Sequence, residues 1–185
     1  MRIVAGAWRG RALQAPAGQT TRPTADRVRQ SLFDMLLHAP WGGREAVQDA
    51  AVLDAFAGTG ALGLEALSRG AATACFIEQD RAALTALRAN IAACGAEAQC
   101  RVLPADATAP PRGTPCSLVF LDPPYGKDLV PRAVRALAAA GWIAPGALVV
   151  GELGRDEAAP PLLGSALAER AHGAARVVVW RWGGE

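Results

Sequence analysis

Short apolar runs alternate along this chain with segments in which apolar residues recur every three or four positions. The run at 51–56 is short and is followed by glycine, which predicts a buried strand. The segment after Thr24 instead places Val28, Leu32 and Leu36 at helical spacing. This spacing predicts a helix with Thr24 as its N-cap. The two kinds of segment follow one another to the end of the chain.

The same reading extends to the rest of the sequence. Strands are predicted at 51–56, 73–78, 100–103, 117–122, 147–150 and 176–180. Helices are predicted from Thr24, over 61–68, from Asp80 to about Gly95, and over 129–140. Strands that alternate with helices favour a mostly parallel sheet with helices on both faces. No repeat or second core is visible, so we interpret 1–185 as one domain with 1–23 as a basic N-terminal arm or hairpin.

Charge changes this picture at the N-terminus. The whole chain has a formal net charge of only +2, whereas its first thirty residues hold six arginines and a single acid, Asp26. A basic arm on a nearly neutral body is typical of proteins that bind a polyanion such as nucleic acid. A solvated, charged segment with no partner would have the same composition, so charge alone leaves both interpretations open.

Composition excludes several classes of protein. The 4 cysteines form no C-x-x-C pair, and His38 and His172 are the only histidines, so we expect no metal site. No apolar run approaches the roughly 20 residues needed to span a bilayer, and the first residues do not resemble a secretory signal. We therefore expect a cytoplasmic protein without a membrane partner, and a monomer is the default oligomeric state.

Candidate chemistry gathers where the predicted strands end. Ligands of open parallel sheets bind beyond the carboxyl ends of the strands, so residues at those ends are expected to meet. In chain order these ends carry Asp54 before a glycine turn, then Glu78, then Asp106, then Asp122-Pro123-Pro124-Tyr125. The sequence therefore predicts a ligand site formed by a glycine turn and several carboxylates at one edge of the sheet.

The glycine turn predicts a cofactor that contains adenosine. Gly58-Thr59-Gly60-Ala61-Leu62-Gly63 fits the pattern G-x-G-x-x-G, and Glu78 follows at about the distance expected for an acid that holds ribose hydroxyls. NAD and S-adenosylmethionine both fit this pattern. Asp54 favours S-adenosylmethionine, because a carboxylate attracts cationic groups and repels the pyrophosphate of NAD. An Asp54 that only orders the loop through backbone amides is the alternative.

The segment Asp122-Pro123-Pro124-Tyr125 indicates the reaction. Two prolines fix the backbone and remove N–H donors, so the Asp122 carboxylate and the Pro123 carbonyl present acceptors. An exocyclic base amine is a poor nucleophile because its lone pair is delocalised, and acceptors on its hydrogens localise that lone pair. Tyr125 offers an aromatic face for a base taken out of its stack. This pattern predicts methyl transfer to an exocyclic amine of a nucleic-acid base.

With these motifs, the chain resembles class I methyltransferases, above all the bacterial 16S ribosomal RNA guanine-N2 methyltransferases of the RsmD type. The resemblance covers nearly the whole chain, and its most specific part is the R-P-T-x-D-R-V-R segment. Besides the glycine turn and D-P-P-Y, the matching segments are Arg2-Ile3-Val4-Ala5-Gly6, Trp8-Arg9-Gly10-Arg11, Arg22-Pro23-Thr24-Ala25-Asp26-Arg27-Val28-Arg29, Leu32-Phe33 and Leu64-Glu65-Ala66-Leu67-Ser68-Arg69-Gly70.

The resemblance implies a Rossmann-like α/β fold with a twisted, mostly parallel sheet of about seven strands, and S-adenosyl-L-methionine as cofactor. The cofactor-binding residues that it implies are Asp54, Phe56, Gly58, Thr59, Gly60, Glu78, Asp106 and Ala107. Those that it implies for the target base are Asp122, Pro123, Pro124 and Tyr125. The residues that it implies as contacts of RNA phosphates are Arg9, Arg11, Arg22, Arg27 and Arg29. The partner that it implies is 16S ribosomal RNA in an assembled or nearly assembled small subunit, and no metal takes part.

Three other functions compete with this one. D-P-P-Y also occurs in DNA adenine-N6 methyltransferases, although 185 residues leave little room for a target-recognition domain. An NAD-dependent oxidoreductase would leave D-P-P-Y unexplained. A non-catalytic RNA-binding assembly factor would not need the intact acids. Thermal stabilisation by S-adenosylmethionine but not by NAD separates the methyltransferases from the oxidoreductase.

Overall fold

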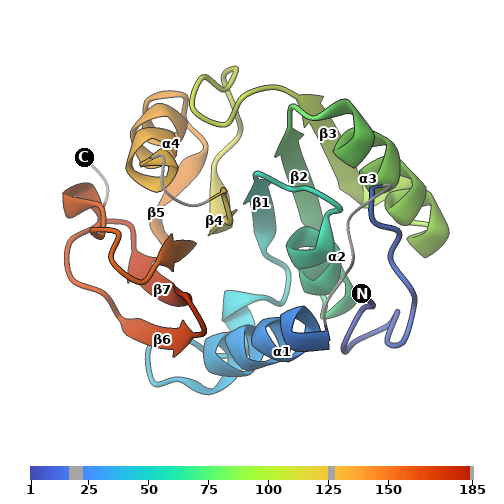
Figure 1. Cartoon of the computed structure of the whole chain (residues 1–185), viewed down its shortest axis with the longest axis horizontal. Coiled ribbons are helices and arrows are strands. Elements are labelled where there is room, and N and C mark those ends of the chain that lie inside the picture. The colour runs from blue at the N-terminus through green and yellow to red at the C-terminus, as the bar shows by residue number, and fades with distance from the viewer. Residues whose placement is uncertain (17–22, 125–127, 184–185) are drawn as a thin grey trace.

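The computed structural model describes residues 1–16, 23–124 and 128–183. A seven-stranded sheet crosses it in the order β3-β2-β1-β4-β5-β7-β6 (Figure 1). The strands are β1 (Ala51–Ala55), β2 (Thr73–Glu78), β3 (Cys100–Pro104), β4 (Cys116–Leu121), β5 (Ile143–Gly154), β6 (Ala168–His172) and β7 (Ala175–Arg181). β1 to β5 pair in parallel, whereas β7 is antiparallel to β5 and to β6. The predicted mostly parallel Rossmann-like sheet is therefore confirmed.

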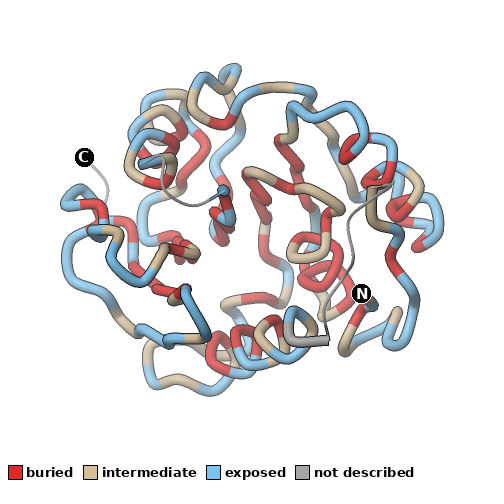
Figure 2. Tube along the Cα trace, in the orientation of Figure 1, coloured by how far each residue is buried: buried red, intermediate tan, exposed pale blue. Residues whose placement is uncertain are grey.

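Helices cover both faces of this sheet. They are α1 (Pro23–His38), α2 (Ala61–Ser68), α3 (Arg81–Cys94) and α4 (Leu129–Ala139), with short 3-10 turns at Arg44–Ala46, Glu97–Gln99 and Pro161–Leu163. Successive strand residues point to opposite faces. In β1, Val52 joins the core beneath α1, α2 and α3, whereas Leu53 joins the core beneath α4. Figure 2 shows that β1, β2, β4 and β7 consist mostly of buried residues, whereas the edge strands β3 and β6 do not.

Helix ends follow the local sequence in one case and depart from it in another. The Asp80 side chain accepts a hydrogen bond from the Ala83 N–H at 2.8 Å, and Gly95 closes α3 in a left-handed conformation, both as predicted. The predicted N-cap at Thr24 was wrong, because α1 already begins at Pro23. Proline favours the first helical position, where no N–H is needed.

The sheet departs from prediction at its far edge. β6 was not predicted, because its residues Glu169, Arg170 and Ala171 are exposed and give no apolar pattern. β6 is the edge strand, so one of its sides has no partner and its side chains need little burial. β5 is also longer than the predicted 147–150, since it continues alongside β7.

The N-terminal arm is a hairpin that joins the core. An isolated bridge pairs Arg2 with Ala12, and the Ile3 N–H donates to the Arg11 carbonyl at 2.9 Å. Ile3 and Leu13 are buried in the same core as α1, α2 and α3. The described part of the arm, residues 1–16, therefore has a fixed place beside the sheet. Within the described ranges, no helix is long and apolar enough to cross a membrane.

Candidate active site

Strand register brings the candidate carboxylates to one edge of the sheet. Ala55, the last residue of β1, is in register with Ile77 of β2 on one side and with Leu121 of β4 on the other. The next residues of those neighbours are Glu78 and Asp122, so both acids flank the point where the chain leaves β1. Parallel strands end at the same edge, which is where open α/β sheets bind ligands.

The backbone between β1 and α2 turns sharply to form the predicted glycine turn. Phe56 has φ 69°, an unusual left-handed conformation for a bulky residue, and its N–H donates to the Ile77 carbonyl at 3.1 Å. Gly58 follows with φ 55°, and a Cβ built on it would meet no atom within 4 Å. The space over the turn is therefore open, as a closely approaching ligand requires.

The third glycine of the motif has a packing role. A Cβ at Gly63 would lie 2.4 Å from the ring of Phe76, so glycine allows α2 to lie close against β2. Gly60, with φ 80°, is the N-cap of α2. The G-x-G-x-x-G pattern thus combines a tight turn with close packing of helix on strand.

Glu78 holds the turn in place. One of its carboxylate oxygens accepts from the Gly58 N–H at 2.8 Å, and the other accepts from the N–H groups of Gln79 and Asp80, each at 2.8 Å. A carboxylate offers about four acceptor positions, so these bonds leave capacity for a hydroxyl donor. Glu78 therefore organises the glycine turn and can still accept from a ribose.

Asp54 lies beneath the turn, with only 2% of its surface exposed. One carboxylate oxygen accepts from the Gly63 N–H at 2.9 Å, the loop-ordering contact considered as its alternative role. Burial raises the pKa of Asp54 to about 8 despite that hydrogen bond, and the charges of Asp122 and Glu78 raise it further. In the part of the chain that the structure describes, no cationic side chain lowers this pKa, so an ionised Asp54 suits a cationic ligand beside it.

We predict that Asp54→Asn makes the ligand-free protein more stable at pH 8.5 than the wild type but leaves stability at pH 4 nearly unchanged. An unfolded aspartate loses its proton near pH 4, whereas folded Asp54 keeps its proton up to about pH 8. Wild-type stability therefore falls as the pH rises between these values, and asparagine removes this contribution while its amide oxygen can still accept from Gly63. Urea unfolding at both pH values measures the difference; a difference that is independent of pH would contradict the prediction.

Asp122 stands at the open side of the site, directly after β4. Its surface is exposed to solvent, yet the protein atoms around it desolvate the carboxyl and, with the charge of Glu152, raise its pKa to about 7. Pro123 is buried and Pro124 is exposed, so the segment is anchored at its first proline. Tyr125 lies outside the described residues.

Asp106 follows β3 at the same edge, since Pro104 is in register with Glu78 and the Ala105 N–H donates to the Glu78 carbonyl at 3.1 Å. One carboxylate oxygen of Asp106 accepts from the N–H and the hydroxyl of Thr108, both at 2.8 Å. Ala107 is buried beside it. Among the residues that the structure describes, no group of three or more His, Cys, Asp or Glu side chains could hold a metal ion.

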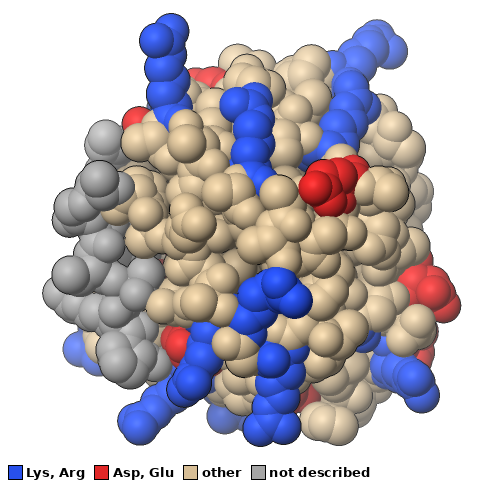
Figure 3. Space-filling model, turned by 90° about the vertical axis from the view of Figure 1, so that its right-hand side faces the viewer, with Lys and Arg blue, Asp and Glu red and all other residues tan. Residues whose placement is uncertain are grey.

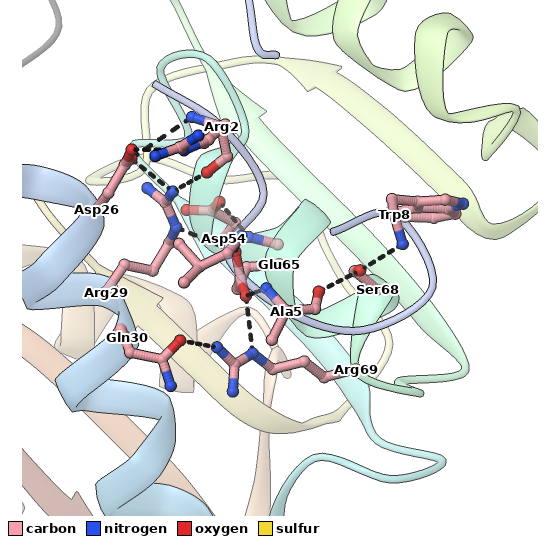
Figure 4. Close-up of polar contacts among 12 residues, drawn as sticks. Arg2, Ala5, Trp8, Asp26, Arg29, Gln30, Asp54, Glu65, Ser68 and Arg69 are labelled. Atoms are coloured by element: carbon pink, nitrogen blue, oxygen red, sulfur yellow. Dashed lines mark hydrogen bonds and ion pairs between the residues drawn. The ribbon is translucent and has the colours of Figure 1, made fainter. Parts of the chain in front are cut away.

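The RNA-contact prediction for Arg29 was wrong. Arg29 is only 4% exposed, and its guanidinium forms ion pairs with Glu65 at 3.2 Å and with Asp26 at 2.9 Å, and also donates to the Arg2 carbonyl. Figure 4 shows these groups converging between α1, α2 and the arm. A buried guanidinium that pairs with two carboxylates of the protein does not reach a phosphate, so Arg29 has a structural role.

Glu65 is the centre of this cluster. It is fully buried in α2 and accepts from the N–H groups of Val4 and Ala5 in the arm, at 2.8 and 3.0 Å. It also pairs with Arg29 and, at 2.8 Å, with Arg69, as Figure 4 shows. A buried carboxylate is stable only when it is paired and hydrogen-bonded, and this one satisfies partners from three segments.

A second contact holds the arm to the end of α2. The Ser68 hydroxyl donates to the Ala5 carbonyl at 2.6 Å and accepts from the Trp8 N–H at 3.0 Å. Gly6 lies so close that a Cβ would come within 1.8 Å of the Ser68 carbonyl oxygen. Trp8 is half-buried and packs against the core. These contacts explain the glycine and serine of the two family motifs.

The other predicted RNA contacts have different positions. Arg9 and Arg27 are exposed and line one open groove of about 1180 Å³ between the arm, α1 and β6. Arg11 is exposed as well, and its guanidinium donates to the Ala93 carbonyl at the end of α3. Arg22 lies outside the described residues. Figure 3 shows that basic side chains outnumber acidic ones on the face that includes α3 and the arm.

Sequence reasoning assigned no role to Glu65 or Asn90, although both are fully buried polar residues. The signal for Glu65 was available, since L-E-A-L-S places an acid inside an otherwise apolar helix. Asn90 gave no comparable signal, because its partners Gln14 and Thr59 are distant in the sequence.

Comparisons with known proteins place the chain in a family. Residues 1–181 match the family model described as Conserved hypothetical protein 95. Ribosomal RNA small subunit methyltransferase D of Escherichia coli (strain K12) is 45% identical over 151 residues, which are 80% of this chain and 72% of the relative. A solved structure, described as putative methyltransferase yhhF from Escherichia coli, is 38% identical with a TM-score of 0.86, covering 100% of this chain and 99% of that chain.

A more distant structure shares the fold. It is a 16S rRNA N2 methyltransferase from Thermus thermophilus in complex with AdoMet and guanosine, 20% identical with a TM-score of 0.68, covering 90% of this chain and 44% of that chain. The family resemblance expected from the motifs is therefore confirmed. The chain belongs to the family described as Conserved hypothetical protein 95, to which its motifs, its fold and its similarity to ribosomal RNA small subunit methyltransferase D all lead.

Proposed function

We propose that this protein methylates the exocyclic N2 amine of a guanine in 16S ribosomal RNA, with S-adenosyl-L-methionine as methyl donor. The observation that carries the proposal is the convergence of the glycine turn with Glu78 on one side and Asp122 on the other, fixed by strand register. The names of the relatives support ribosomal RNA as the substrate. The AdoMet and guanosine in the Thermus structure support the cofactor and the base.

The residues at this edge fit the cofactor. Open space over Gly58 accommodates a close ligand, and Glu78 keeps acceptor capacity for ribose hydroxyls. Buried Asp54 would lie near the cationic amino-acid end, and Asp106 with Ala107 near the adenine. Phe56, Thr59 and Gly60 complete the turn around it. Bound there, S-adenosylmethionine supplies an electrophilic methyl group.

The target base would lie at the Asp122-Pro123-Pro124-Tyr125 segment. Asp122 and the Pro123 carbonyl accept from the amine hydrogens, which localises the nitrogen lone pair for attack. The burial of Pro123 fixes the direction of that carbonyl. Catalysis by these residues is mainly positioning and hydrogen bonding at a desolvated site, and it requires no metal from the protein.

Arg9, Arg11 and Arg27, with Arg22, are the residues that we propose for phosphate contacts. We expect Arg9→Ala with Arg11→Ala to weaken RNA binding and to flatten its dependence on salt. RNA that contacts fewer arginines releases fewer counterions when it binds. Filter binding from about 50 to 200 mM salt measures the slope. Arg132→Ala with Arg135→Ala, an exposed pair on α4, is the matched control and should keep the slope. An unchanged slope in the arm variant would remove the arm from the interface.

The decisive experiment incubates the protein with labelled S-adenosylmethionine and small subunits that lack the modification. Label in a guanine N2 position of 16S RNA is the expected result. Parallel reactions contain deproteinised 16S RNA and duplex DNA. Label in DNA adenine would favour the DNA-methyltransferase alternative, and binding without any transfer would favour the assembly factor.

We further propose that the substrate is the RNA within a small ribosomal subunit and that the enzyme acts as a monomer in the cytoplasm, where that subunit is found. Transfer to subunits but not to deproteinised RNA is the result expected from the first statement. If the enzyme acts as a monomer, the active protein is expected to sediment with the mass of a single chain.

A further inference from the structure

The N-terminal arm and the cofactor turn are joined by one buried side chain. Asn90, on the inner face of α3, has no exposed surface. Its amide oxygen accepts from the Gln14 N–H at 2.7 Å, and its amide nitrogen donates to the Gln14 carbonyl at 3.0 Å. The same nitrogen donates to the Thr59 carbonyl at 3.0 Å. Asn90 thus binds the backbone of the arm and of the turn at the same time.

No other side chain of this size could make this set of bonds. The site presents one N–H donor and two carbonyl acceptors, which require one acceptor and two donors in return. An asparagine amide supplies this combination, whereas aspartate lacks the donors and leucine lacks both. The Asn90 side chain is fully buried and its three bonds are partly buried, so its removal takes three hydrogen bonds from the backbone of Gln14 and Thr59 at once.

The two partners of Asn90 belong to different parts of the proposed site. Thr59 lies between Gly58 and Gly60 in the turn over which the cofactor would bind. Gln14 follows the hairpin that carries Arg9 and Arg11. A shift of the Thr59 carbonyl therefore changes the bonds that hold Gln14, and a displaced arm changes those that hold the turn.

We propose that Asn90 is a positioning residue through which the cofactor and the RNA reinforce each other's binding. The inference rests on the proposed function, since it takes the turn as the cofactor site and the arm as an RNA contact. A cofactor that fixes the turn also fixes Asn90, and Asn90 then holds the arm in its RNA-binding position. Coupling is reciprocal, so RNA on the arm strengthens cofactor binding by the same factor.

The test measures the affinity of the protein for small subunits that lack the modification, with and without saturating S-adenosylhomocysteine. For the wild type we expect about tenfold tighter binding with the cofactor product, within the usual range of coupling between sites. For Asn90→Ala the ratio should fall to about one. A wild-type ratio of one, or an Asn90→Ala ratio equal to that of the wild type, overturns the proposal.

Ser68→Ala is the matched control, because Ser68 also holds the arm but does not contact the turn. This variant should bind subunits more weakly in both conditions and keep the coupling ratio. A simple loss of arm stability would instead lower the ratio equally in both variants, which contradicts a specific role for Asn90. Failure of the wild type to bind S-adenosylhomocysteine or to transfer a methyl group would refute the proposed function itself.

Hydrogen exchange in the wild-type protein keeps the test independent of whether Asn90→Ala folds. S-adenosylhomocysteine should slow exchange of the Gln14 amide, which donates to Asn90, by about the coupling factor. The control is the amide of Gly154, the last residue of β5, which donates to the Glu157 side chain at 2.7 Å. Its exchange rate should not change. Equal exchange at Gln14 with and without the ligand overturns the coupling.

Discussion

Asp122→Asn is expected to lower the turnover number for methyl transfer by roughly a hundredfold or more while S-adenosylhomocysteine affinity stays close to that of the wild type. Asp122 directly follows β4 and is exposed, and we propose that the base amine lies beside its carboxylate. Asparagine has nearly the same size, but it replaces one acceptor oxygen with a donor nitrogen and removes the negative charge. The base amine then loses the group that localises its lone pair.

Single-turnover kinetics and calorimetry with S-adenosylhomocysteine measure the two quantities separately. Asp128→Asn serves as the control, because Asp128 is an exposed acid in the same connection between β4 and α4. That variant should transfer methyl groups at the wild-type rate. Retained turnover in Asp122→Asn, combined with weaker cofactor binding, would move Asp122 from the base site to the cofactor site.

Glu65→Ala is expected to destabilise the fold by about 3–5 kcal/mol, the usual cost of removing one partner of a buried ion pair. Arg69 would be left buried without its carboxylate and Arg29 would keep only that of Asp26, while the N–H groups of Val4 and Ala5 would lose their acceptor. The arm would lose two of its hydrogen bonds to α2 and keep those to Ser68. Urea unfolding at equilibrium measures the change.

The ion pair between Arg176 and Glu169 provides the comparison. Its atoms approach to 3.0 Å, but the Glu169 side chain is 48% exposed, so Glu169→Ala should cost less than about 1 kcal/mol. Equal, small losses in Glu65→Ala and Glu169→Ala would show that burial does not strengthen the cluster around Glu65. Arg69 also lies over the ring of Phe33 at 4.7 Å, so its packing contributes to the same cluster.

Features with local causes could be predicted from the sequence. The strand 73–78, the strand 51–56 apart from its last residue, and the end of α3 at Gly95 follow from residues within a few positions, because hydrophobic period and capping act over single turns and single strands. The candidate carboxylates were also placed at one edge correctly, since parallel strands fix which of their ends lie together.

The assignment of individual charges required the tertiary structure. Arg27 and Arg29 lie two positions apart in one basic motif, yet Arg27 is exposed and Arg29 is buried against Glu65. Helical geometry points these two side chains in different directions, but only the packing of α1 on α2 determines which direction faces the protein interior. Composition predicts a basic N-terminal region. It cannot separate the arginines that are exposed to a ligand from those that form ion pairs inside the protein.

By itself, the sequence determined the order of elements, the glycine turn and the acids that end the strands, because these depend on neighbouring residues. Only the tertiary structure decided that Asn90 joins Gln14 to Thr59 and that Asp54 is buried beneath the turn. Hydrogen bonds between distant segments and the exclusion of water arise when the chain packs, so no local pattern records them.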